Sequence, residues 1–165
     1  MKENGRIIGL SFLLCFIGFL TRDFFLSYSM TAITGENMLF DKSWELPYQS
    51  FPLAVFIFSF GIIPFLYLLV KKVCKLTTLT SQYVSIILII TSGLLFYALR
   101  ILYLKVKAAK IHDLLQRAEF AEGAEIPSIR FEEVNLEIYL LTGLIVGTLL
   151  SILMYRKKAG KGVEK

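Results

Sequence analysis

The feature that most constrains this sequence is a set of four apolar stretches, each long enough to cross a lipid bilayer. They cover residues 7–27, 51–70, 79–104 and 136–155. A helix needs about 20 such residues to cross roughly 30 Å of hydrocarbon. Its backbone hydrogen bonds are then satisfied within the segment, which lipid requires. Because 56% of the 165 residues are hydrophobic, more than in soluble domains, we expect an all-α integral membrane protein. The fold would be a four-transmembrane-helix bundle forming a single membrane domain.

The first apolar stretch also has the basic start of a signal peptide. However, no small-x-small cleavage pattern follows it where one would be due, and the chain continues with Arg22 and Asp23 instead. We therefore expect this stretch to remain in the protein as its first membrane helix.

The charges between the stretches predict the orientation. More than half of the lysines and arginines lie in residues 1–6, 71–78 and 156–165, with few acids among them, whereas residues 28–50 and 105–135 carry more acids than bases. Flanks rich in lysine and arginine stay on the cytoplasmic side. We expect a multi-pass protein of the plasma (cell inner) membrane with both termini in the cytoplasm.

The outer side would carry one sizeable element, residues 105–135. Its first half has apolar residues near helical spacing and contains no helix breaker, so we expect the third helix to continue beyond the membrane to about residue 122. Ile129 and Phe131 alternate with polar residues, which is typical of a short strand. Residues 38–44 could pair with this strand as a short β-ribbon. Together these elements would form a small outer cap.

The most specific local pattern is a row of small residues on the fourth stretch. Gly143, Gly147 and Ser151 recur every four residues, so they lie on one helix face where another backbone can approach closely. We expect this face to pack against a helix. The pattern leaves open whether that helix belongs to the same chain or to another one.

Four charged residues are expected at membrane depth near the outer boundary: Arg22, Asp23, Arg100 and Glu137. Charges in this position are costly and often functional, although long side chains near helix ends can reach water. We expect Arg100 to pair with Asp23 or Glu137, because each charge would relieve the desolvation of the other.

The sequence offers little else for chemistry. It contains one histidine, His112, and two cysteines, Cys15 and Cys74, which lie too far apart in the predicted topology to act together. A zinc site or a haem needs several such ligands. We expect no catalytic residue, no cofactor and no metal. Since the basic residues accompany apolar runs and no recognition motif, we expect no nucleic-acid partner either.

These observations favour a non-catalytic multi-pass membrane protein. It would be a subunit or accessory of a membrane assembly, or a homo-oligomer, with the lipid bilayer and transmembrane helices as its partners. A small subunit of a transporter, a toxin-immunity protein and a membrane component of phage defence all fit this description.

Two other classes stay open. An oligomeric channel or carrier is suggested by Ser81, Ser85 and Ser92 on the third stretch and by a kink expected from Gly61 and Pro64 in the second. An enzyme that acts on lipid at the outer leaflet would have to use the charges at Asp23 and Arg100.

Overall fold

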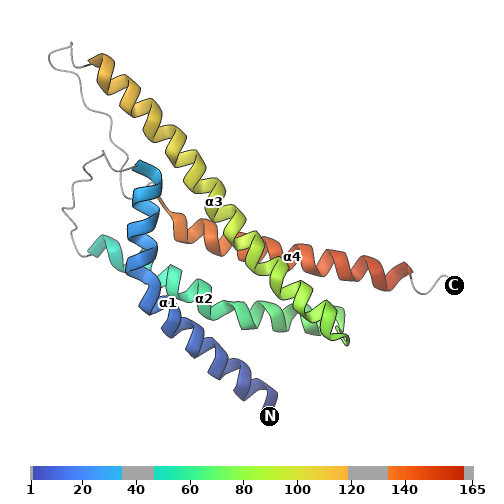
Figure 1. Cartoon of the computed structure of the whole chain (residues 1–165). Coiled ribbons are helices and arrows are strands. Elements are labelled where there is room, and N and C mark those ends of the chain that lie inside the picture. The colour runs from blue at the N-terminus through green and yellow to red at the C-terminus, as the bar shows by residue number, and fades with distance from the viewer. Residues whose placement is uncertain (1, 35–46, 119–133, 162–165) are drawn as a thin grey trace.

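A computed structural model describes residues 2–34, 47–118 and 134–161 of the chain. These residues form four helices: α1 (Lys2–Thr34), α2 (Pro47–Cys74), α3 (Leu79–Ala118) and α4 (Leu136–Lys161) (Figure 1). The prediction of an all-α helical bundle is confirmed, and no strand occurs in the described ranges. The two segments proposed for a β-ribbon lie outside them.

All four helices are long and apolar enough to cross a membrane. Their candidate spans are Gly5–Ile33, Leu53–Cys74, Leu79–Ile111 and Leu136–Arg156. The protein is therefore a multi-pass membrane protein.

All four spans are longer than the sequence pattern predicted, those of α2 and α4 by only one or two residues and those of α1 and α3 by more. The apolar part of α1 continues past residue 27 to Ile33, because the two adjacent charged residues, Arg22 and Asp23, do not end the helix. Helix α3 has 40 residues, which is roughly 60 Å at 1.5 Å per residue, about twice the thickness of a hydrocarbon core. The continuation predicted beyond Ala118 falls outside the described residues.

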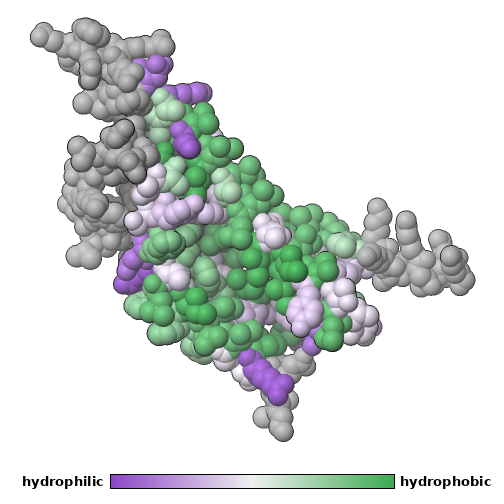
Figure 2. Space-filling view, in the orientation of Figure 1, coloured by the Kyte–Doolittle hydropathy of each residue, from purple (hydrophilic) through white to green (hydrophobic). Residues whose placement is uncertain are grey.

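The helices alternate in direction, so the bundle has two distinct ends (Figure 1). At what we call the terminal end, α1 and α3 begin and α2 and α4 finish. At the far end, α1 and α3 finish and α2 and α4 begin. Helix α3 crosses α4, α1 packs on α2, and α2 also lies against α4. Apolar side chains cover most of the face shown in Figure 2, and strongly hydrophilic ones gather toward its edges.

A short turn joins α2 to α3 at the terminal end. Lys75 has a left-handed φ of 48°, and the N–H of Leu76 donates to the carbonyl of Lys71 at 3.2 Å. This bond closes the helix in the manner of a Schellman cap. The hydroxyl of Thr78 lies 2.8 Å from that of Ser81 at the start of α3. Both helix ends are thus closed by local hydrogen bonds.

The buried core is small and divided between the two ends of the bundle. At the far end, α1 meets α3 and the start of α4 through Ile33, Leu104, Ala108, Val134 and Leu136. Toward the terminal end, α2, α3 and α4 meet through Val70, Leu76, Ile89 and Leu144. Most other large apolar side chains are exposed, as expected for helices that face lipid or other membrane helices.

Candidate functional site

The small residues of α4 lie directly against α3. A Cβ atom built on Gly147 would lie 2.7 Å from Cβ of Ser92 and 2.9 Å from Cα of Ile89. One on Gly143 would lie 2.7 Å from the carbonyl oxygen of Ser92. Such distances are shorter than van der Waals contact, so only glycine allows the two backbones to approach this closely. Ser151, one turn further along, is fully buried, and its hydroxyl has no hydrogen-bond partner among the described residues.

A second close approach joins α1 to α2. A Cβ on Gly18 would lie 3.3 Å from Cα of Ile57, and one on Gly61 would overlap with the sulfur of Cys15. This crossing could not be predicted from the sequence, because its two glycines stand on different helices and form no repeat. Helix α2 is continuous through Gly61 and Pro64, so the glycine provides room for a neighbour.

Aromatic side chains link α1, α2 and α3 nearer the far end. The ring of Phe25 stacks on Phe56, with centroids 4.1 Å apart, and lies 5.1 Å from the ring of Tyr97. The hydroxyl groups of Tyr97 and Ser29 are 2.9 Å apart, and the Ser29 hydroxyl also donates to the carbonyl of Phe25. This polar contact was not predicted. It could have been suspected only from Ser29 and Tyr97 being polar groups in otherwise apolar runs.

A polar contact also links α2 and α3 near the terminal end. The hydroxyl of Tyr67 donates to Oε1 of Gln82 at 3.0 Å, and Nε2 of Gln82 donates to the carbonyl of Leu76 at 3.3 Å. Gln82 therefore ties its own helix to the end of α2 and to the turn between them.

Arg22 and Asp23 form an ion pair on α1, with Nε of Arg22 and Oδ1 of Asp23 3.3 Å apart. The Arg22 guanidinium also lies 4.2 Å from the centre of the Phe19 ring. The Asp23 side chain is 80% exposed, against 33% for Arg22. The apolar span of α1 continues for ten residues beyond Asp23 to Ile33, so the pair lies within this span and not at its end.

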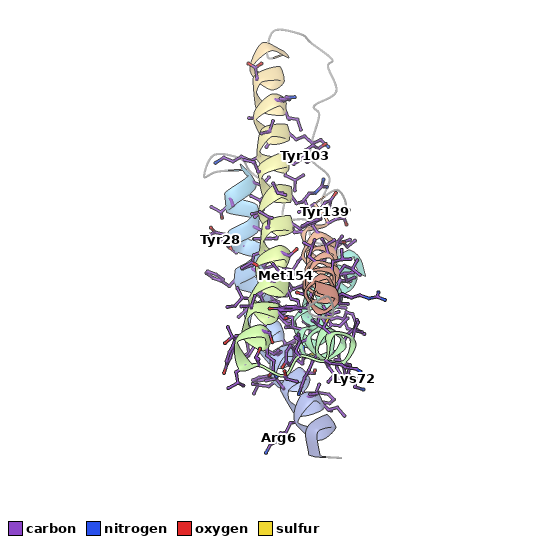
Figure 3. All side chains as sticks on the ribbon, turned by 90° about the vertical axis from the view of Figure 1, so that its right-hand side faces the viewer. Arg6, Tyr28, Lys72, Tyr103, Tyr139 and Met154 are labelled. Atoms are coloured by element: carbon purple, nitrogen blue, oxygen red, sulfur yellow. The ribbon has the colours of Figure 1, made fainter. Side chains whose placement is uncertain are left out.

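Arg100 contacts the start of α4 but does not pair with the expected acids. Its Nε donates to the carbonyl of Val134 at 3.2 Å, and its guanidinium lies 4.7 Å from the Tyr139 ring centre and 5.2 Å from that of Tyr103. Figure 3 places these two tyrosines in the upper part of the view, with Arg6 and Lys72 toward the opposite end. Among the described residues, no ion pair joins Arg100 to Asp23 or Glu137.

The position of Glu137 explains this difference. It is 5% exposed, in the first turn of α4, where the positive end of the helix dipole stabilises a carboxylate. Glu137 precedes Tyr139 by two residues, which corresponds to roughly 200° around a helix. Arg100 contacts the Tyr139 side of α4, so Glu137 faces nearly the opposite way.

The described residues contain no group of three or more histidine, cysteine or acidic side chains that could hold a metal ion. The side chain of His112 lies outside the described structure. No protein-family model, curated protein or solved structure matches this chain.

Proposed function

We propose that this protein is a non-catalytic component of the cell inner membrane that acts by associating with other membrane helices. It would be a subunit or accessory of a larger assembly, or a homo-oligomer. The supporting observation is the incomplete coverage of α1. Only 11% of the most apolar segment of α1 is buried by the described residues, whereas the corresponding values for α2, α3 and α4 are 28%, 22% and 33%.

The charges within the spans support association rather than catalysis. Asp23 points away from the bundle, while Arg100 is engaged with the start of α4. The two residues that a lipid-acting enzyme would use are thus not joined by a contact among the described residues. Two of the three serines suggested for a pore are covered within the chain: Ser85 is fully buried, and Ser92 packs on Gly143 and Gly147 of α4. These two offer no open polar face to a further copy.

The proposed orientation has both termini in the cytoplasm. Arg6, Lys71, Lys72, Lys75 and Arg156 all belong to the terminal end, and such residues favour the cytoplasmic side. The last turns of α3 then extend outside the cell, since the helix is longer than the bilayer is thick.

Purification from native membranes in a mild detergent tests this proposal. A tag at the C-terminus of the full chain would be used, and the mass of the protein part of the complex measured. We expect a mass well above 18.8 kDa, from further copies of the chain or from another membrane protein in constant ratio. A chain that elutes alone as a monomer, both in detergent and in nanodiscs made from the native membrane, would contradict it.

A further inference from the structure

The exposed face of α1 carries a row of residues with a seven-residue repeat. Successive members are four, three, four, three and four residues apart, the spacing of the contact positions in a left-handed pair of helices. We call this row the α1 seam; it consists of Gly5, Gly9, Phe12, Phe16, Phe19 and Asp23.

All six seam residues are exposed. Phe12 and Phe16 are 73% and 61% exposed, and a Cβ on Gly5 or Gly9 would meet no other atom within 4 Å. The residues of α1 that contact the bundle, such as Gly18 and Ser29, lie on a different face. Among the described residues, none therefore covers the seam.

Lipid alone is a poor neighbour for this seam, because it contains a carboxylate at depth. Asp23 lies within the candidate span Gly5–Ile33, ten residues before its end, and its side chain is 80% exposed. A carboxylate that faces hydrocarbon is costly, so a polar partner beside Asp23 would stabilise this seam.

We propose, on the basis of the association proposed above, that the α1 seam binds the α1 seam of a second copy of this chain. Two copies inserted with the same topology present α1 in parallel, so each supplies a helix with the same repeat in the same direction. Gly5 and Gly9 allow the backbones to approach at one end. Phe12, Phe16 and Phe19 interdigitate along the middle.

Charge complementarity at Asp23 favours a second copy over an unrelated helix. In a parallel left-handed helix pair, a contact residue that comes four residues after the previous one, as Asp23 does after Phe19, inserts between four residues of the facing helix, including the one that precedes its own equivalent. Asp23 of one copy thus lies beside Arg22 of the other, and the two-fold axis creates this contact twice. Arg22 and Asp23 also form an ion pair within one chain, so the contact between copies would give each charge a second partner. The ion pair within one chain uses only the Nε atom of Arg22, which is one of several donors of the guanidinium group.

Cysteine cross-linking in the membrane tests the geometry. Phe12→Cys would be introduced into the full chain after Cys15→Ala and Cys74→Ala, and the membranes then oxidised. The matched control is Phe65→Cys, since Phe65 is also exposed (47%) and lies at a similar distance from the terminal end of its span on α2. We expect a disulfide-linked dimer for Phe12→Cys and mostly monomer for Phe65→Cys. Equal cross-linking of the two variants would refute the seam.

A charge exchange tests the role of Asp23 and Arg22. We expect Asp23→Arg and Arg22→Asp each to weaken self-association about tenfold, because each places like charges together. The double variant, Arg22→Asp with Asp23→Arg, restores opposite charges across the axis, so its dimer fraction should return to within about threefold of the native chain. A double variant as weak as either single one would show that the pair does not act across copies.

The outcomes also separate this inference from the function on which it rests. If the chain is a single copy held in constant ratio by another protein, the association stands and the second-copy seam is wrong. If the chain forms dimers that are unaffected by changes at Phe12, Arg22 and Asp23, the interface lies elsewhere and the seam is again wrong. A lone monomer in every membrane condition contradicts both proposals.

Discussion

Gly147 gives the sharpest prediction about stability, because its surroundings are mostly backbone. A methyl group added there would lie 2.7 Å from Cβ of Ser92, and 2.9 Å from both Cα of Ile89 and the carbonyl oxygen of Leu88. Carbon contacts are optimal at about 3.5–4.0 Å. Two of the three neighbours cannot rotate away, so α3 and α4 must separate by about 1 Å. We expect this overpacking in Gly147→Ala to cost about 1–3 kcal/mol.

The matched control is Gly9→Ala, which makes the same chemical change in open space. Both variants gain about 1 kcal/mol of intrinsic helix propensity, so the difference between them isolates the packing cost. Unfolding would be followed by helical circular dichroism during a titration from mild detergent into sodium dodecyl sulfate. Protein concentrations must be low enough to keep the chain monomeric. If Gly147→Ala is as stable as Gly9→Ala, the close contact of α3 with α4 does not exist in the protein.

Three further predictions concern topology and the polar contacts. A reporter fused after Lys75 or at Lys165 should be active only in the cytoplasm and one fused near Glu122 only outside, since the basic flanks stay inside; reversed activities would overturn the orientation. Tyr97→Phe should cost about 1 kcal/mol of unfolding free energy through loss of the hydroxyl contact with Ser29, whereas Tyr83→Phe, at a 64% exposed position, should cost nothing measurable. The losses of unfolding free energy in Arg100→Leu and Glu137→Gln should add in the double variant to within about 0.5 kcal/mol, because the two side chains lie on different sides of α4. A larger coupling would support the ion pair expected from the sequence.

The sequence was sufficient for the number and approximate bounds of the four helices, because hydrophobic length is a direct physical requirement for crossing a bilayer. The predicted end of the first stretch at residue 27 was too early, because α1 continues to Thr34. A local pattern cannot distinguish a helix end from a charged turn within a longer helix.

Contacts between helices were predictable only where one helix carried the whole signal. The row of Gly143, Gly147 and Ser151 indicated a packing face, but its partner, Ser92 on α3, depends on how two helices cross. The contacts of Gly61 with Cys15 and of Tyr97 with Ser29 depend on the rotation of each helix about its axis. The same rotation turns Glu137 away from Arg100. Sequence spacing gives relative positions within a helix and not the rotation of one helix against another.

The turn between α2 and α3 has a consequence for the synthesis of the protein. Only residues 75–78 separate the two helices, and Lys75 and Thr78 close the adjoining helix ends locally. A nascent α2 that has entered the bilayer is therefore followed almost at once by α3, and the pair inserts as one hairpin. In the proposed orientation, Lys71, Lys72 and Lys75 stay on the cytoplasmic side while α2 and α3 insert, so we expect the topology of this hairpin to be set before α4 enters the membrane.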